Sequence, residues 1–360
     1  MGRLTHISNA PLQISPRSII VLTREHIGDL IGTTPALRSL RRRFPKAHIA
    51  VEVGERAACI LENNPNVDEI ILRKEHQGAI GKLDFIRLLR RRKFDLGVIL
   101  DDSSGMILNL WLGGISHRVG ILRKKKYANL LTQSIYADRS VHETIDNFLA
   151  VVELLGGDIN DRKTEVFPTQ EDESYINELL SQPLTPSLHY SHLKSLPHAT
   201  RLIALNPGAS LPANRWLPER FSELNNLLAE DPNTRVLLLG GGGDLQIADQ
   251  ILSDCILKPL ALTGKLTVMQ LARLLKRCAY LVTGDTGPMH LAVAVGTPVV
   301  ALFGPADPNV SGPGVLEGNV ILRKVASCPE CTKQHCTKDN GCMRAISAEE
   351  VVAACSKKGG

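Results

Sequence analysis

The sequence predicts an α/β protein made of two lobes, each a doubly wound parallel sheet with helices on both faces. Three observations support this prediction. Short β-branched runs alternate with helical segments, the alternation stops near residue 168 and restarts near residue 202, and 360 residues with 43% hydrophobic content suffice for two cores. Ligands of such lobes bind at the carboxyl ends of the strands, so we expect the site in a cleft between the lobes.

The first series of elements opens on a β-branched strand, and apolar residues three or four positions apart mark its helices. Pro35 is acceptable in a first helical turn, and Gly156 with Gly157 is typical of a helix end. We expect strands at residues 18–22, 48–53, 69–72 and 96–100, and helices at residues 33–40, 82–92 and 141–155.

The second series follows a stretch rich in Pro and His, which we interpret as an irregular linker that begins with a short helix near residues 176–180. After it we expect strands at residues 202–205, 235–239, 280–283 and 298–303, and helices at residues 221–228, 268–275 and 289–295. The predicted domains are an N-terminal lobe (17–167), a linker (168–200), a C-terminal lobe with a Cys-rich tail (201–345), and a final helix and tail (346–360).

Composition and charge limit the possible functions. No apolar run reaches the ~18 residues that a membrane-spanning helix needs, and the N-terminus lacks the apolar block of a secretory signal, so we expect a cytoplasmic protein. The net charge of +5 is uneven: residues 1–165 contain 25 Lys and Arg against 19 Asp and Glu, and the remainder contains 17 against 18. This asymmetry indicates an anionic partner for the N-terminal half.

Three basic runs lie in that half of the chain. We interpret Arg41–Arg43 and Arg90–Lys93 as solvated helix ends, where cations suit the helix dipole. Arg123–Lys126 has no helical pattern around it, so we expect this run to be the contact surface.

Two loops that follow strands carry residues suited to chemistry. In Thr23–Asp29, Gly28 permits close backbone approach and Asp29 falls at a helix start, where it is either an N-cap or a general base. In Pro207–Ser210, small residues with Arg215 nearby suit a phosphate, and the alternative is a plain strand-to-helix loop.

Two further loops follow strands of the second series. Gly240–Gly243 precedes Asp244 but fits neither the dinucleotide fingerprint nor a P-loop. It is therefore either a tight turn or a turn whose acid holds ribose hydroxyls. Gly284–His290 places small residues at a helix N-terminus, a ready anion site flanked by Asp285 and by His290, whose alternative role is to cap the helix. Trp216 is expected to anchor its loop in the core.

Three stretches share one order and spacing with a known family: Arg24–Pro35; Asn206–Ser210 with Arg215–Phe221; and Gly284–Ala292 continuing to Phe303–Pro308. In these stretches the chain resembles the family 9 glycosyltransferases, the bacterial heptosyltransferases of lipopolysaccharide inner-core synthesis. The resemblance implies a GT-B fold of two Rossmann-like lobes, with the acceptor in the N-terminal lobe and the donor in the C-terminal lobe. It also implies inverting transfer from a nucleotide-activated heptose, usually the ADP form, without a catalytic metal or other cofactor.

By position, Asp29 corresponds to the family's general base, which takes the proton of the acceptor hydroxyl. Ser210 corresponds to a phosphate contact, Asp244 to a ribose contact, and Lys265 with Leu266 to the adenine edge. The implied donor-binding residues are Gly28, Ser210, Arg215, Asp244, Lys265, Leu266, Asp285, Thr286, Gly287 and His290, of which the last four cradle the sugar and diphosphate. For the acceptor we expect contacts with Arg118, Arg123 and Lys124.

One residue departs from the family pattern. The family usually has a Lys, whose ammonium meets the diphosphate, immediately before a pair made of Arg or His followed by Trp. This chain has Asn214 at that position. An amide cannot neutralise the developing charge of the leaving group. Either Arg215 or Lys265 takes over this role, or donor affinity or the donor itself differs.

Four of the eight cysteines are gathered in one short segment: Cys328, Cys331, Cys336 and Cys342. Such a cluster either holds a structural zinc or iron or consists of reduced thiols without metal. The remaining four cysteines are scattered, and we interpret them as small buried hydrophobes.

The sequence thus predicts an inverting glycosyltransferase that moves a heptose or related sugar from a nucleotide donor, ADP-heptose, to an anionic glycolipid of the lipopolysaccharide core. It would work as a peripheral protein at the inner face of the cytoplasmic membrane. The alternatives are a nucleotide-sugar epimerase on the same fold and a non-catalytic module that binds polyanions. The aromatic content of 4% argues against nucleic acid as a partner.

Overall fold

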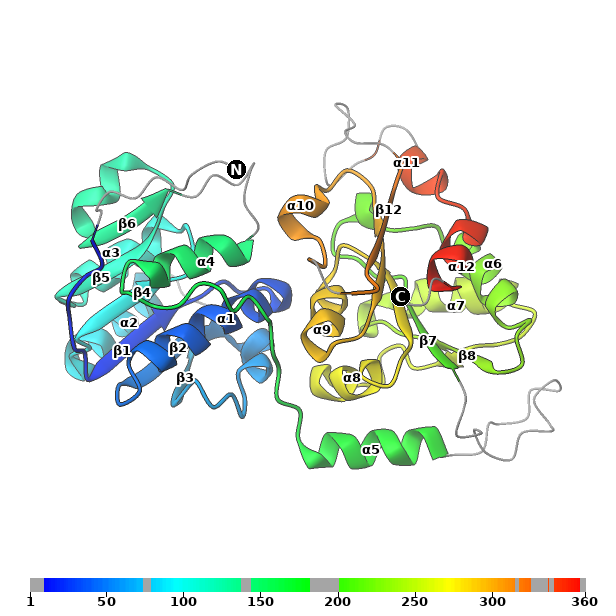
Figure 1. Ribbon diagram of the computed structural model, residues 1–360, viewed down its shortest axis with the longest axis horizontal. Helices are drawn as coiled ribbons and strands as arrows, with labels where there is room; N and C mark the ends of the chain where they lie inside the picture. The colour runs from blue at the N-terminus through cyan, green and yellow to red at the C-terminus, as the bar shows by residue number, and fades with distance from the viewer. Residues whose placement is uncertain are drawn as a thin grey trace. The chain divides into compact units, whose positions relative to one another are not determined.

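The computed structural model describes residues 10–73, 79–136, 144–181, 201–314, 317–324, 336 and 340–356. The chain divides into two compact units, Met1–Phe167 (unit 1) and Pro168–Gly360 (unit 2). Each unit contains a six-stranded sheet with helices on both faces (Figure 1). All strand pairs in both sheets are parallel, which confirms the predicted fold class.

The sheet of unit 1 has the order β3-β2-β1-β4-β5-β6. Its strands are β1 (Ser18–Leu22), β2 (His48–Gly54), β3 (Glu69–Arg73), β4 (Leu96–Ile99), β5 (His117–Leu122) and β6 (Gln133–Tyr136). Its helices are α1 (Ile27–Arg43), α2 (Ala79–Arg92), α3 (Ser104–Leu112) and α4 (Thr144–Glu153), with short 3₁₀ helices η1 (Glu55–Ile60) and η2 (Lys125–Leu130).

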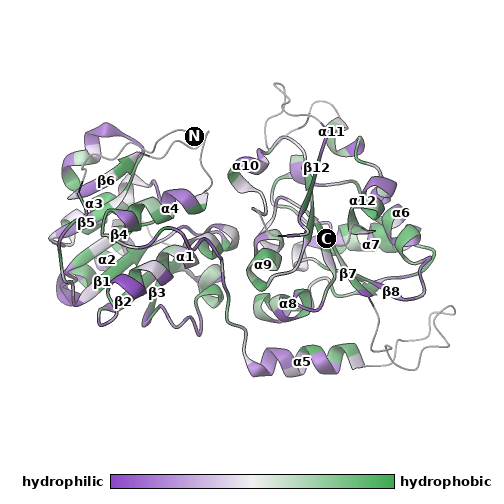
Figure 2. Ribbon diagram, in the orientation of Figure 1, coloured by the Kyte–Doolittle hydropathy of each residue, from purple (hydrophilic) through white to green (hydrophobic). Residues whose placement is uncertain are grey.

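Both faces of this sheet are buried. Successive side chains of a strand point to opposite faces, and Ile20 and Leu22 of β1 pack with Leu89 of α2 and Leu110 of α3. Helices α1 and α4 pack against each other on the other face, in front of the sheet in Figure 1. This two-sided burial explains why the strands are continuous hydrophobic runs, drawn green in Figure 2.

Helix α1 begins at Ile27, earlier than predicted, so Pro35 lies in its third turn and not in its first. A proline has no N–H to donate to the carbonyl four residues back. Here the Thr34 hydroxyl donates to the Ile31 carbonyl at 2.8 Å, so that oxygen keeps a partner and the helix continues. The N-cap of α1 is His26, which leaves Asp29 in the first turn with its carboxylate available for other contacts.

The sheet of unit 2 has the order β12-β11-β10-β7-β8-β9. Its strands are β7 (Arg201–Asn206), β8 (Thr234–Leu238), β9 (Leu260–Ala261), β10 (Tyr280–Gly284), β11 (Val299–Phe303) and β12 (Val320–Arg323). Its helices are α5 (Gln170–Ser181), α6 (Pro218–Leu228), α7 (Leu245–Asp254), α8 (Val268–Leu275), α9 (Gly287–Val295), α10 (Pro308–Ser311), α11 (Gly341–Arg344) and α12 (Ala348–Ser356), with 3₁₀ helices η3 (Pro212–Asn214) and η4 (Gly242–Asp244).

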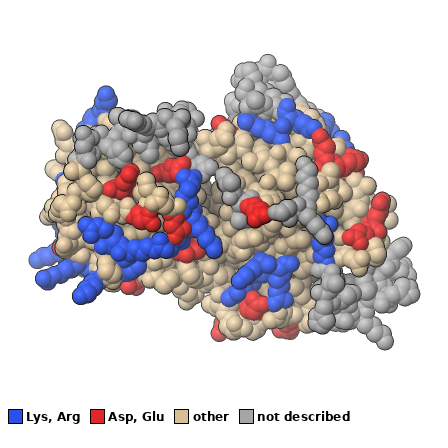
Figure 3. All heavy atoms as spheres, viewed as in Figure 1, with Lys and Arg blue, Asp and Glu red and all other residues tan. Residues whose placement is uncertain are grey.

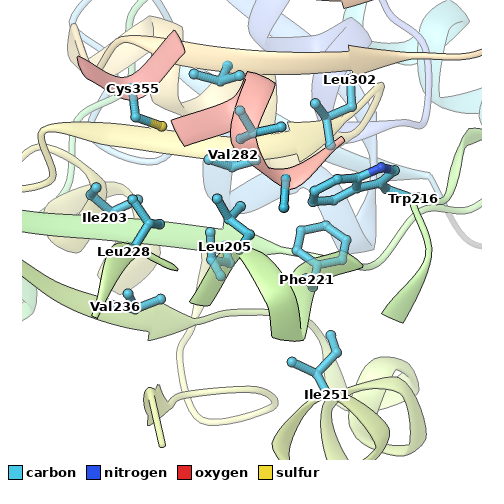
Figure 4. Packing of buried hydrophobic residues seen from close by; sticks show 14 of the residues in the cluster. Ile203, Leu205, Trp216, Phe221, Leu228, Val236, Ile251, Val282, Leu302 and Cys355 are labelled. Carbon is cyan, nitrogen blue, oxygen red and sulfur yellow. The ribbon is translucent and has the colours of Figure 1, made fainter. Parts of the chain in front are cut away.

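Trp216 anchors its loop in the core of unit 2, as predicted. It is 2% exposed, and its ring lies 4.9 Å from that of Phe221 in an edge-to-face arrangement. The indole Nε1 donates to the Ile346 carbonyl at 3.1 Å. Figure 4 shows both rings among apolar side chains of β7, β10 and β11. The loop after β7 is therefore fixed by a large buried side chain at its far end.

Besides the start of α1, two further segments differ from their predictions, and the sequence analysis did not predict α3, β5, β6, α7, β9 or β12. The helix expected near residues 176–180 runs from Gln170 to Ser181, and it packs on α8, where Arg273 donates to the Pro168 carbonyl at 2.8 Å. The remainder of the predicted linker lies outside the described residues. The run Arg123–Lys126 overlaps the start of η2 at Lys125, so the expectation of no helix there was wrong.

None of the helices in the described ranges combines the length and the hydropathy that a bilayer crossing requires.

We expect Trp216→Ala to lower the free energy of unfolding of unit 2 by about 3–5 kcal/mol, because a buried aromatic side chain is lost from a packed core. Urea denaturation followed by circular dichroism measures this change. The matched control is Trp111→Ala in unit 1, where the side chain is 47% exposed and the expected change is within about 0.5 kcal/mol. Equal effects of the two substitutions would contradict the anchoring role.

Candidate functional site

The carboxyl ends of β1 and β4 form the point in unit 1 where the strand order reverses. In doubly wound sheets, ligands bind outside the strands at such a point. The loop after β1 leads to Asp29, and the loop after β4 contains Asp101 and Asp102. These two loops are therefore the candidate site of unit 1.

Arg73, the last residue of the edge strand β3, holds the loop after β1. Arg73 Nε donates to Glu52 at 2.5 Å, and its other nitrogens donate to the Thr23 carbonyl at 2.7 Å and to Glu25 at 2.9 Å. Burial alone would lower the pKa of Arg73. The carboxylate of the buried Glu52 outweighs this effect, so the pKa of Arg73 is raised. The loop thus rests on a buried ion pair at the end of the sheet.

A second arginine, Arg24, joins the two loops. Its Nη1 donates to Asp29 Oδ1 at 3.0 Å, and its Nε lies 4.0 Å from Asp101 Oδ1. Burial raises the pKa of Asp101; Arg24 opposes this effect, and Asp102 adds to it. Asp29 Oδ2 accepts no hydrogen bond from the part of the chain that the structure describes. One carboxylate oxygen is therefore oriented by a cation while the other is open to a ligand proton.

Of the three predicted acceptor contacts, the structure separates Arg118 from the other two. Arg118 Nε donates to the Leu130 carbonyl at 2.6 Å, and burial lowers the pKa of this guanidinium. Arg118 therefore braces β5 against η2, while Arg123 and Lys124 are exposed. Lys and Arg side chains also gather over the visible face of unit 1, at the left of Figure 3, in agreement with its excess of positive charge.

In unit 2 the strand order reverses between β7 and β10, and a polar chain links their ends. Asn206 Nδ2 donates to Thr283 Oγ1 at 3.0 Å and to the Gly208 carbonyl at 3.2 Å. Thr283 and Thr286 share a hydrogen bond of 2.9 Å between their hydroxyls. The loop bearing Ser210 and the N-terminus of α9 are thereby joined. Sequence reasoning missed Asn206 and Thr283; a polar residue that closes an apolar strand was the available signal.

Asp244 lies directly against two glycines of neighbouring loops. A Cβ on Gly208 would lie 2.4 Å from Asp244 Oδ2, and one on Gly240, whose φ is +145°, would lie 3.0 Å from Asp244 Cβ. The Gly241 N–H donates to Asp244 Oδ2 at 2.8 Å. The structure therefore brings the second and third predicted loops together around one carboxylate.

The predicted adenine edge adjoins the same loop. The Gly264 N–H donates to the Gly240 carbonyl at 2.9 Å, which links the loop after β9 to the loop after β8. Lys265 is exposed, and its Nζ donates to the Ala261 carbonyl at 2.8 Å. Leu266, next to it, is partly exposed.

The N-terminus of α9 completes the candidate site of unit 2. Thr286 is its N-cap and Gly287 is its first residue. The free backbone N–H groups of the first turn of α9 therefore follow directly after Asp285 in the loop after β10. Asp285 Oδ2 accepts a hydrogen bond of 2.9 Å from Ser311, which sequence reasoning missed. His290 lies in the first turn and is not the helix cap.

Asn214, the residue that departs from the family pattern, is packed beside β10. A Cβ on Gly284 would lie 2.5 Å from the Asn214 carbonyl oxygen. Asn214 is only 5% exposed, and its side-chain Oδ1 has no hydrogen-bond partner among the described residues. Arg215 Nε donates to the Ala209 carbonyl at 2.9 Å, so this guanidinium holds the Ser210 loop.

Half of the cysteine cluster lies in the described residues. Cys336 Sγ accepts a hydrogen bond of 3.2 Å from the Asn340 N–H, and Cys342 Sγ packs near Gly304. Cys328 and Cys331 lie outside the described residues. No group of three His, Cys, Asp or Glu placed to hold a metal ion occurs within the described ranges. The structural zinc or iron stays a prediction.

A sequence profile described as glycosyltransferase family 9 (heptosyltransferase) matches residues 82–341 of the chain. The chain belongs to this family. As a family 9 member it is a glycosyltransferase, as the sequence predicted. The motif that contains Asp29 precedes the matched span, so the assignment does not depend on it.

Curated relatives extend the similarity over most of the chain. Lipopolysaccharide heptosyltransferase 2 of Escherichia coli is 27% identical over 320 residues, which cover 84% of this chain and 87% of that protein. The lipopolysaccharide core heptosyltransferase OpsX of Haemophilus influenzae is 22% identical over 362 residues, covering 96% and 98%. This family 9 chain thus spans nearly the whole length of both relatives.

Solved structures share the fold. The family 9 glycosyltransferase of Veillonella parvula matches with a TM-score of 0.83 and 26% identity, over 96% of this chain and 98% of that one. The ADP-heptose lipopolysaccharide heptosyltransferase II of E. coli matches with a TM-score of 0.73 and 23% identity, over 94% and 97%. The GT-B fold expected from the resemblance is confirmed.

We expect Gly208→Ala to weaken ADP binding about tenfold or more, because the new Cβ displaces the Asp244 carboxylate, and a hydrogen bond to a charged group contributes about 1.5–3 kcal/mol. Isothermal titration calorimetry with ADP measures this effect. The matched control is Gly243→Ala in the adjacent loop, where a Cβ meets no atom within 4 Å. Unchanged affinity in Gly208→Ala would contradict the predicted contact between Asp244 and the nucleotide.

Proposed function

We propose that this protein is an inverting heptosyltransferase that transfers a heptose from ADP-heptose to an acceptor of the lipopolysaccharide inner core. The observation that carries the proposal is that each unit of this family 9 chain has a polar site at the point where its strand order reverses. Asp29 lies at this point in unit 1, and Asp244 with the N-terminus of α9 lies at it in unit 2. The names of the curated relatives support the sugar and the acceptor.

In the proposed reaction, Asp29 removes the proton of the acceptor hydroxyl through its open oxygen, Oδ2. The hydroxyl oxygen forms a bond to the anomeric carbon of the heptose, the bond between that carbon and the phosphate oxygen breaks, and ADP leaves with the bonding electrons. Attack from the side opposite the leaving group inverts the anomeric centre. Arg24 acts as a positioning residue because it orients Oδ1 of the same carboxylate.

On the donor side, we propose that the charge on the departing diphosphate is met by dipoles and a hydroxyl, without a catalytic metal. We assign this role to the N–H groups in the first turn of α9, which follows the N-cap Thr286, and to the exposed hydroxyl of Ser210. Asp244 is assigned to the ribose hydroxyls, and Lys265 with Leu266 to the adenine edge. Asp285, Gly287 and His290 are assigned to the sugar and phosphates.

We also propose that the acceptor is an anionic glycolipid that the protein meets as a peripheral protein at the inner face of the cytoplasmic membrane. The excess of Lys and Arg in unit 1 and the exposure of Arg123 and Lys124 support an anionic partner. Nucleic acid is not part of the proposal.

We expect Asp29→Asn to lower kcat by roughly a hundredfold to ten-thousandfold, the usual contribution of a general base. Affinity for ADP should stay unchanged, because the nucleotide site lies in unit 2. Release of ADP in the presence of a glycolipid acceptor and titration with ADP measure the two quantities. The control is Asp84→Asn, an exposed carboxylate of α2. Retained transfer would exclude Asp29 as the base, and epimerised sugar formed without acceptor would favour the epimerase alternative.

We expect Asn214→Ala to weaken ADP-heptose binding about tenfold without lowering the free energy of unfolding. Asn214 Oδ1 is buried and has no partner in the described structure, and an unsatisfied group of this kind costs about 1–3 kcal/mol. A donor group of the bound ligand would satisfy this oxygen, and the substitution removes that gain. The control is Asn225→Ala. Asn225 Oδ1 is likewise buried without a partner in the described residues, but its Nδ2 donates to the Leu257 carbonyl at 2.7 Å, so its loss should destabilise the protein without changing affinity. The same pattern in both variants would exclude a ligand role for Asn214.

A further inference from the structure

The outer surface formed by α2, α3 and η2 has a composition that the candidate sites do not explain. We define the α3 face as Leu108 and Trp111 of α3, Arg91 of α2, and the basic run Arg123–Lys126. Helix α3 packs against both α2 and η2. Arg90 of α2 fixes one of these contacts by donating to the Leu112 carbonyl at 2.8 Å.

Helix α3 is apolar on both of its sides. Ile107 and Leu110 are buried in the core of unit 1, as expected for the inner side of a surface helix. Leu108 and Trp111 lie one turn apart on the outer side and are 40% and 47% exposed. A helix that only covered a sheet would present polar residues there. The outer side of α3 is therefore suited to an environment less polar than water.

The charge around these two side chains has one sign. Residues 104–136 include five Lys and Arg and no Asp or Glu. The four side chains of Arg123–Lys126 are exposed, and none forms an ion pair with a carboxylate in the described part of the chain. Arg91 is exposed on the neighbouring helix. Lys126 Nζ lies 4.8 Å from the centroid of the Tyr127 ring, a contact that does not neutralise the ammonium. Exposed cations without a carboxylate partner keep their charge for an external anion.

We propose that the α3 face docks on an anionic lipid bilayer, with Leu108 and Trp111 entering the headgroup region and the basic run meeting lipid phosphates. Trp has an apolar ring and a polar N–H, which suits it to the boundary between headgroups and acyl chains. Cations near an anionic leaflet each strengthen attachment. This inference rests on the proposed function only in its choice of a glycolipid acceptor, and vesicle binding is measured without any sugar transfer.

The observations favour a bilayer over two other partners. A second copy of the chain would bring the same basic run against itself, and like charges at an interface are unfavourable. Nucleic acid would satisfy the cations but offers no apolar layer for Leu108. A bilayer supplies both, because its phosphates lie directly above an apolar interior.

Intrinsic fluorescence tests the proposal, because the chain has two tryptophans and Trp216 is buried. With vesicles of phosphatidylethanolamine and phosphatidylglycerol, we expect a blue shift of the emission and quenching by brominated lipid. Both effects should be absent in Trp111→Phe and weak with phosphatidylcholine alone. No binding to the anionic vesicles, or the same shift in Trp111→Phe, would overturn the proposal.

Two variants test the apolar and the basic parts separately in vesicle sedimentation. Leu108→Ser with Trp111→Ser should lower the partition coefficient about tenfold or more. The control, Leu245→Ser with Ile256→Ser, replaces apolar side chains of unit 2 that are more exposed, at 51% and 76%, and should not lower it. Lys124→Gln, Lys125→Gln and Lys126→Gln together should lower it about a hundredfold, at about fivefold per charge. Partitioning unchanged in both test variants would overturn the proposal.

Two further outcomes separate this inference from its rivals and from the proposed function. If light scattering shows a dimer that Trp111→Ser splits, the face is a self-interface and the proposal fails. If the Leu108 and Trp111 variant transfers sugar normally to a deacylated acceptor but poorly to glycolipid in vesicles, the docking role is supported. Vesicle binding by a wild-type protein that transfers no heptose would overturn the proposed function and leave the docking surface in place.

Discussion

Parallel pairing is the constraint on which the rest of this structure depends. Because every strand in a sheet runs the same way, the chain leaves each sheet at one edge, and residues distant in sequence meet there. In each sheet the strand order proceeds outward from the middle in both directions. The loops that follow the two central strands therefore turn away from each other and leave a crevice between them. Arg24 joins two loops there in unit 1, and Asn206 joins two loops, 77 residues apart in sequence, in unit 2.

The site of unit 2 is held together mainly by neutral groups. An amide and two hydroxyls link β7 to α9, and glycines let a single carboxylate lie between two loops. The guanidinium of Arg215 donates through Nε to a backbone carbonyl of the same site. A site of this kind stabilises a polyanion through fixed dipoles, which need no reorganisation when the charge develops. The replacement of a lysine by Asn214 is consistent with that arrangement.

The sequence predicted the strands of the core well because a strand buried on both faces is a continuous apolar run, and its ends coincide with polar or glycine residues. The start of α1 was misplaced because Pro35 is typical of a first turn, and no local pattern shows that the Thr34 hydroxyl takes over the missing hydrogen bond. The helical turn at Lys125 was missed because four consecutive cations obscure any apolar period.

The same distinction applies to the candidate sites. Asp29 and Asp244 could be proposed from the sequence because each belongs to a motif that is continuous along the chain. Arg24, Asn206 and Thr283 were missed as site residues because their partners are set by strand order, which no local pattern contains. The structure then divided a set that the sequence had grouped: Arg118 is occupied by backbone carbonyls, while Arg123 and Lys124 are free of such contacts.

The uneven charge of the two halves has a consequence for the approach of the protein to any charged surface. With a net charge of +6 on residues 1–165 and −1 on the remainder, a negatively charged plane attracts the first half of the chain and not the second. This attraction acts within roughly one Debye length, about 8 Å at physiological ionic strength, and therefore before any side chain touches the surface. Added salt shortens that distance, so it lowers the fraction of encounters that begin with the first half of the chain.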